Sequence, residues 1–92
     1  MEYYDKVCEI YNLWHLNIKP KINQAVSTLF ELEVGKIKDN CQKRNYTGAL
    51  ELVRVLINGF NEENYKGKEW GSDASKIFEK LNDLEKGLSA EG

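Results

Sequence analysis

The stretch Thr47–Phe60, TGALELVRVLINGF, decides the fold of this chain. Its apolar residues recur at intervals of three and four, which places them on one face of a helix with 3.6 residues per turn. That face consists of Ala49, Leu52, Val53, Leu56, Ile57 and Phe60. Leu50 and Val55 lie outside it, so the helix is apolar over more than half of its circumference. We therefore expect a central helix that is contacted by other helices on two sides.

Three more helices are predicted around this one, so that the 92 residues form a single all-α domain. No segment alternates apolar and polar residues for long enough to form a strand. Short connections favour antiparallel neighbours, and the expected fold is a small antiparallel helical bundle of about four helices. The expected helices span residues 2–16, 20–43, 48–58 and 73–88.

The predicted core follows from the apolar faces of these other helices. On the first helix the face comprises Tyr4, Val7, Ile10, Tyr11 and Trp14. On the second it comprises Ile22, Val26, Leu29, Phe30, Val34, Ile37 and Cys41. On the last it comprises Ile77, Phe78, Leu81, Leu84 and Leu88.

Capping signals set the expected helix starts. Pro20 suits the first turn of a helix, because its missing N–H would lack a helical partner there in any case. Thr47 has a hydroxyl group that can cap the third helix, and Ser72 or Asp73 can cap the last one.

Glycines set the expected helix ends and interruptions. Gly59 is expected to adopt the left-handed conformation and to stop the third helix, with Phe60 folded back onto Val55. Gly35 lowers the stability of the second helix by about 1 kcal/mol relative to alanine, so a kink is expected there if anywhere. From Gly87 onward the last helix is expected to fray.

Composition and charge narrow the class of protein. Hydrophobic residues make up 41% and charged residues 30% of the chain, as in ordinary globular proteins and unlike disordered ones. The net charge of −2 gives no general attraction to nucleic acids. A basic patch lies near the end of the second predicted helix, where cations complement the helix dipole. It comprises Lys36, Lys38, Lys43 and Arg44.

The expected compartment is the cytoplasm. No apolar run approaches the roughly 18 residues of a transmembrane helix, and the first residues lack the basic head and apolar core of a signal peptide. Cys8 and Cys41 are the only cysteines and show no metal-binding or redox spacing. We expect both to be reduced packing residues, shielded from thiol reagents.

Catalytic and metal-binding patterns are missing from the sequence. The only histidine, His15, has Tyr11 and Lys19 at the positions four residues away, so a helical zinc pair is excluded. It also has no serine or cysteine close in sequence to serve as a nucleophile. Gly67–Gly71 lacks the spacing of a phosphate-binding loop. The sequence therefore predicts a protein that is not an enzyme, with no cofactor, no metal and no small-molecule substrate.

The candidate binding residues lie in the predicted polar loop 61–71. Tyr65 and Trp70 either pin this loop onto the bundle or stay exposed as anchors for a partner protein. Lys66 and Lys68 stand beside them and complete the candidate partner-binding set. For Trp70 we favour the pin, because a long loop needs a fixed point to keep its two helices in register.

The order of elements from Leu16 to Leu81 also carries a family resemblance. The residues concerned are Ile22, Val26 and Leu29, then the turn Asn45–Leu50, then Trp70, Ile77 and Leu81. This arrangement resembles the helical domain shared by the steroid receptor RNA activator protein and the C-terminus of the COPII outer-coat subunit. The second helix is longer here than in that family. The resemblance implies a non-enzymatic helical bundle that binds another protein, as a coat- or adaptor-type interaction domain does.

Two alternative hypotheses are compatible with the residues. Small acidic-to-neutral bundles of this length include bacteriocin-immunity proteins, and a phage-encoded inhibitor that acts by stoichiometric binding has the same physical character. A small helical nucleic-acid-associated protein is the other alternative, although the net charge speaks against it.

Overall fold

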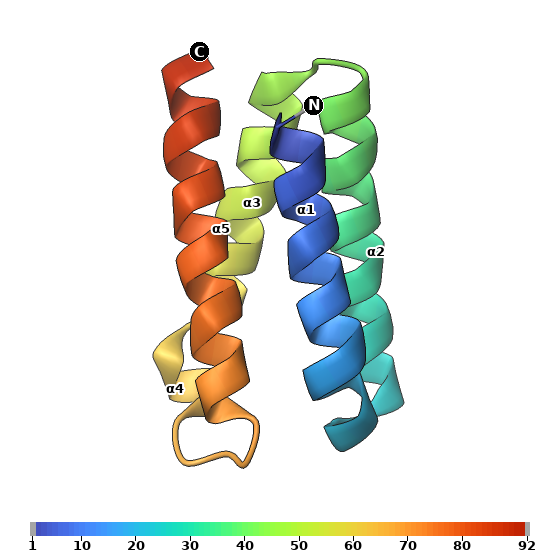
Figure 1. Ribbon diagram of the computed structural model, residues 1–92, viewed down its shortest axis with the longest axis vertical. Helices are drawn as coiled ribbons and strands as arrows, with labels where there is room; N and C mark the ends of the chain where they lie inside the picture. The colour runs from blue at the N-terminus through green and yellow to red at the C-terminus, as the bar shows by residue number, and fades with distance from the viewer. Residues whose placement is uncertain (1, 92) are drawn as a thin grey trace.

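The computed structural model describes the backbone of residues 2–91, and the side chains of these residues except Glu2 and Glu62. Over that range the chain is all α-helical, without strands, and the helices pack against one another along a common long axis (Figure 1). The molecule measures 36 × 20 × 18 Å. The predicted fold class is confirmed.

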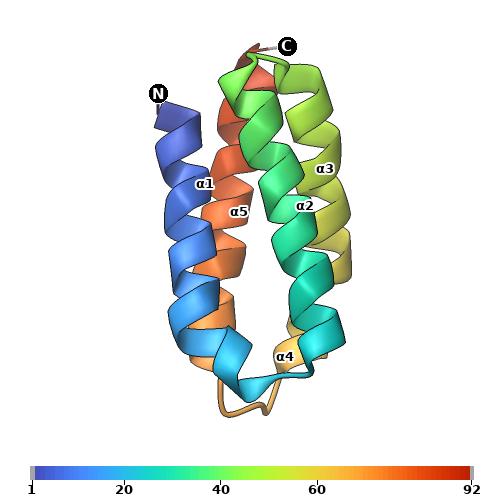
Figure 2. The same cartoon turned by 90° about the vertical axis from the view of Figure 1, so that its right-hand side faces the viewer.

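Four long helices form the bundle, and short helical turns connect them. The helices are α1 (Glu2–Leu13), α2 (Gln24–Gln42), α3 (Tyr46–Gly59), the single turn α4 (Glu62–Tyr65) and α5 (Gly71–Glu91). Helix α1 packs against α2 and α5, and α3 packs against the same two helices. Successive long helices run in opposite directions, as Figures 1 and 2 show. The expected contact of α3 on two sides is thus present.

The first helix does not end at residue 16. It continues as a π-helical turn, Trp14–Ile18, and then as a 3₁₀ turn, Lys19–Lys21. The π turn is wider than an α turn, and both of its terminal side chains, Trp14 and Ile18, are buried. Pro20 therefore lies within a short connecting turn and does not start α2.

Helix α2 begins four residues later than predicted. Its N-cap is Asn23, whose side-chain oxygen accepts a hydrogen bond of 2.8 Å from the backbone N–H of Ala25. Asparagine is among the best capping residues, so this start has its own local cause. The helix then runs without interruption through Gly35 to Gln42.

The cap of α3 is Asn45 and not Thr47. The Asn45 side chain accepts a hydrogen bond of 3.2 Å from the backbone N–H of Gly48. Arg44, immediately before it, takes a positive φ of 60° and completes the turn after α2. With the chain direction set there, the helix starts at Tyr46 and Thr47 lies exposed in its first turn.

The predicted end of α3 is also corrected. Among the described glycines only Gly67 has a positive φ, so Gly59 is not left-handed. Phe60 does not fold back onto Val55, which remains 59% exposed. The Phe60 ring instead enters the core beside the ring of Trp14, with the ring centroids 5.7 Å apart. Burial of an aromatic ring in the core outweighs a local contact on the helix surface.

The last helix is longer than predicted at both ends. It begins at Gly71, before the predicted caps Ser72 and Asp73, and it remains helical to Glu91. The hydroxyl group of Tyr3 donates to the carbonyl oxygen of Gly87 over 3.0 Å and contacts Glu91 Oε1 at 2.9 Å. This tie to α1 explains why the chain does not fray from Gly87 onward.

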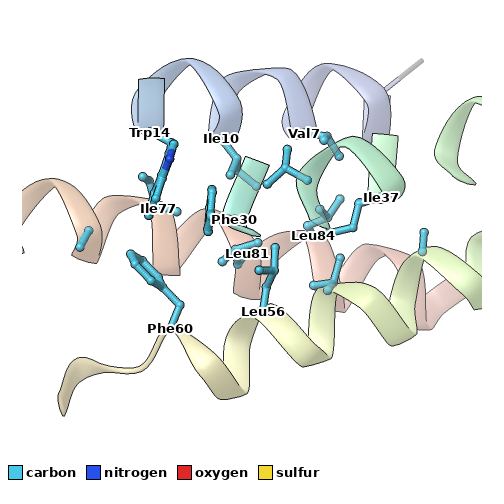
Figure 3. Close-up of a cluster of buried hydrophobic side chains, with 14 of the residues drawn as sticks. Val7, Ile10, Trp14, Phe30, Ile37, Leu56, Phe60, Ile77, Leu81 and Leu84 are labelled. Carbon is cyan, nitrogen blue, oxygen red and sulfur yellow. The ribbon is translucent and has the colours of Figure 1, made fainter. Parts of the chain in front are cut away.

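A cluster of aromatic and aliphatic side chains fills the bundle (Figure 3). Trp14 is 1% exposed and stacks on Phe30, with ring centroids 3.7 Å apart. Its indole N–H donates to Ser27 Oγ over 3.0 Å, so the one buried polar side chain among the described residues is satisfied. The predicted core position of Trp14 is confirmed.

The predicted apolar face of α2 is wrong in two residues. Val26 and Leu29 are 54% and 65% exposed, whereas Ser27 is fully buried. The buried face of α2 is Ser27, Phe30, Val34, Ile37 and Cys41, which keeps helical spacing but is rotated from the predicted one. The hydrogen bond from Trp14 makes Ser27 acceptable in the core. On α1, Tyr11 is likewise exposed rather than buried.

Candidate functional site

The most exposed residues in the first half of α2 carry no charge. From residue 23 to residue 35, eight residues are exposed and none of them is charged. They are Asn23, Gln24, Ala25, Val26, Thr28, Leu29, Leu32 and Gly35. A solvated helix normally presents charged residues on its outer side. This surface resembles the contact side of a helix.

A groove runs beside this surface, between α2 and α3, with a volume of about 630 Å³. Val26 and Leu29 line it from α2, and Val55 and Gly59 line it from α3. Glu33 is the one charged residue among the described residues of its lining, and it forms an ion pair with Lys36 at 3.7 Å. The groove is therefore mostly apolar, with Glu33 as its charged residue on the α2 wall.

The core aromatic cluster extends into the groove. Trp14, Phe30 and Phe60 belong both to the core and to the groove lining. Trp70 lines the groove from the segment before α5, and Asn64 lines it from α4. Figure 1 shows α4 close to the start of α5. A ligand in this groove would thus rest on rigid, packed residues.

We refer to the eight exposed residues of α2 and the groove together as the α2–α3 face. Its exposed aliphatic side chains are Val26, Leu29, Leu32 and Val55, between 54% and 65% exposed. Single exposed aliphatic residues are ordinary on protein surfaces. A group of four around an apolar groove is typical of a binding site.

The four candidate residues of the loop fall into three different environments. Tyr65 is 7% exposed and stacks on Phe60 with ring centroids 5.4 Å apart, so it pins α4 to the core. Trp70 is half-buried, packs against the core and lines the groove. Lys66 and Lys68 are exposed, and together with Tyr65 they line a separate, more polar pocket. The structure therefore brings only Trp70 to the α2–α3 face.

The other residues discussed from the sequence lie on ordinary surface. His15 is exposed and lies 4.0 Å from Glu31 Oε1, while Lys19 pairs with the same carboxylate at 3.2 Å. In the basic patch, Lys43 pairs with Asp39 at 3.0 Å. The described side chains contain no group of three or more histidine, cysteine, aspartate or glutamate residues placed to hold a metal ion.

The two cysteines are free thiols in different surroundings. Cys41 is fully buried, and this burial raises the pKa of its thiol because the charged thiolate loses its hydration. Cys8 is only half-buried at the edge of α1. Core shielding therefore holds for Cys41 and is partial for Cys8.

Sequence reasoning missed Leu32 and placed Val26 and Leu29 in the core. The available signal was an excess of apolar residues on one helix. Once Phe30, Val34 and Ile37 occupy the core side, further aliphatic residues at other angles must face outward. The lack of charge between residues 23 and 30 was the second signal.

No helix in the described part of the chain is long and apolar enough to cross a membrane. No protein-family model, curated protein or solved structure matches the chain.

Proposed function

We propose that this protein is a non-enzymatic protein–protein interaction module and that it binds through the α2–α3 face. One observation carries the proposal: the exposed residues in the first half of α2 are uncharged and border a mostly apolar groove. Removing apolar surface from water contributes about 25 cal/mol per Å² of area buried. Four exposed aliphatic side chains beside a groove can supply that energy to an interface.

The shape of the groove favours a helical ligand. Two antiparallel helices form its walls, and the stretch of α2 whose exposed residues are uncharged is about three turns long. An amphipathic helix that places apolar residues at i, i+3 or i+4 and i+7 fits such a groove. Trp70, half-buried at the groove lining, offers an aromatic side chain of the kind that is enriched among the strongest interface contacts.

Charge on α2 does not favour nucleic acid as the ligand. Lys36 and Lys43 in the basic patch each have a carboxylate within 4 Å on the same helix. Net phosphate attraction depends on unneutralised cations, so this patch is a weak candidate. A protein ligand accounts for the aliphatic side chains, which a nucleic acid would leave uncovered.

The test compares three tagged full-length baits in a native extract of the source cells: the wild type, Leu29→Lys and Leu16→Lys. Leu16 is 71% exposed and lies outside the groove lining, so it is a matched control for adding a charge at an exposed leucine. We expect a protein that the wild type and Leu16→Lys retain and that Leu29→Lys loses.

Far-UV circular dichroism should show that all three baits remain folded, because both positions are exposed. Recovery of the same proteins by all three baits would contradict the proposed function.

A further inference from the structure

We propose that the α2–α3 face is filled by a second copy of this chain in a twofold-symmetric contact. This inference rests on the proposed function and names the partner. In a twofold contact the same surface patch is used by both copies, so the patch must be complementary to itself. Shape, free space and charge on the face all meet this requirement.

The face contains both a ridge and a groove. Val26, Leu29 and Leu32 follow one another at intervals of three on α2 and project into solvent. The groove lies directly beside this ridge, because Val26 and Leu29 also form one of its walls. An antiparallel arrangement about an axis near Leu29 would place the ridge of each copy against the groove of the other.

A glycine leaves room for close approach of a second helix at the groove. Gly59 lines the groove on the α3 side, and a Cβ atom there would meet nothing within 4 Å. Gly35 has the same open space, but it lies farther round α2 and lines a groove on the α1 side together with Cys8 and Tyr11. A small residue such as Gly59 allows a helix backbone to come near.

Charge selects a second copy in particular. Near a twofold axis each residue meets itself or its close neighbours, so any charge there would face a like charge. The eight exposed residues of the face carry none, and the half-buried Glu31 and Glu33 beside them are paired with lysines of the same chain, Lys19 at 3.2 Å and Lys36 at 3.7 Å. The nearest exposed cations are Lys21, before the helix, and Lys36, after the uncharged stretch.

The size of the face predicts a weak dimer. The surface of one chain is 5611 Å². A specific interface needs about 1,000 Å² in total, or about 500 Å² from each copy, which is close to a tenth of that surface. Three turns of α2 and one flank of α3 are near this lower limit. We therefore expect an association in the micromolar range that depends on concentration.

The experiment is sedimentation velocity of the purified full chain over rising concentration, for the wild type, Leu29→Lys and Leu16→Lys. We expect the wild type and Leu16→Lys to move from the 10.6 kDa of one chain toward twice that mass. Leu29→Lys should keep the mass of one chain at every concentration. The two variants carry the same added charge, so a difference between their masses shows the effect of the position and not of the charge.

A wild-type protein with the mass of one chain at high micromolar concentration would overturn this inference, as would a Leu29→Lys variant that associates like the wild type. That result alone would not contradict the proposed function. If the purified protein is monomeric but the extract contains a protein that only Leu29→Lys fails to retain, the face binds a different chain.

Discussion

Helices α2 and α5 have similar lengths, 19 and 21 residues, but their outer surfaces differ in chemistry. The exposed residues of α5 include Lys76, Glu79, Asp83, Lys86 and Glu91. Charged side chains of α5 also pair with its neighbours, Glu85 with Arg54 at 3.2 Å and Lys80 with Glu9 at 3.1 Å. In the first three turns of α2 none of the exposed residues is charged, and the half-buried Glu31 and Glu33 are paired with Lys19 and Lys36.

The inner surfaces of the two helices are equivalent in spacing but not in composition. Helix α5 buries Ala74, Ile77, Leu81, Leu84 and Leu88, which include all its leucines. Helix α2 buries Ser27 and Cys41 along with larger residues, and it leaves Leu29 and Leu32 in solvent. The fold thus buries every leucine of α5 but only part of the apolar residues of α2. Phe78 of α5, which was predicted in the core, is half-buried and lies outside the core cluster. The apolar residues that α2 leaves in solvent are the kind that a contact surface requires.

The largest effect expected from this comparison is on stability at matched leucines. Leu84 is fully buried, so Leu84→Ala should lower the free energy of unfolding by about 2–5 kcal/mol through lost burial and a cavity. Leu29 is 65% exposed, and Leu29→Ala should change it by less than about 0.5 kcal/mol. Urea denaturation at low protein concentration, where the chain is monomeric, measures both. Equal losses at the two positions would mean that Leu29 belongs to the core.

A second expected effect separates the two aromatic residues of the loop. Tyr65 is a buried pin, and Tyr65→Ala should cost about 3 kcal/mol of stability. Trp70 is half-buried, so Trp70→Ala should cost roughly 1–2 kcal/mol, less than a fully buried tryptophan does. It should also weaken binding at the α2–α3 face. Thermal melts in parallel with sedimentation provide the measurement, and a larger stability loss for Trp70→Ala than for Tyr65→Ala would reverse the assignment.

The smallest effect compares one glycine of each helix. Gly35 on α2 has open space around its Cα, so Gly35→Ala should raise the stability of the monomer by about 0.5–1 kcal/mol through better helix propensity. A Cβ atom at Gly87 on α5 would lie 2.8 Å from Cε1 of Tyr3. Gly87→Ala should therefore be less stable than the wild type, because the Tyr3 ring must move. A gain of equal size at both positions would show that the contact with Tyr3 does not constrain α5.

The sequence was sufficient for the fold class and for most of the core. The strict spacing of the faces on α3 and α5 determines which side of each helix is buried, and Ala49, Val53, Leu81 and Leu84 are buried as expected. The ends of the helices were harder to predict from the sequence. Pro20 and Thr47 were the predicted start signals of the second and third helices, whereas Asn23 and Asn45 are the observed caps, and tertiary contacts decide between such local alternatives.

The candidate site was harder to predict, because it consists of apolar residues that the core does not bury. On α2 the aliphatic residues cover two angular ranges, and periodicity alone assigned Val26 and Leu29 to the core together with Phe30. The buried hydrogen bond between Trp14 and Ser27 fixes the actual rotation of the helix. A contact between side chains thirteen residues apart cannot be read from the period of either helix. Likewise, the loop position of Trp70 did not reveal that it lines a groove between α2 and α3.

Site-specific photo-crosslinking tests the central claim most directly: the outer side of α2 contacts protein and the outer side of α5 contacts water. A benzophenone side chain would replace Leu29 in one variant and the exposed Lys76 of α5 in the other. After irradiation, in native extract and with the purified chain, the Leu29 variant should form a discrete covalent adduct and the Lys76 variant should form none. Absence of an adduct at position 29 in both settings, or equal adducts at positions 29 and 76, would contradict the claim.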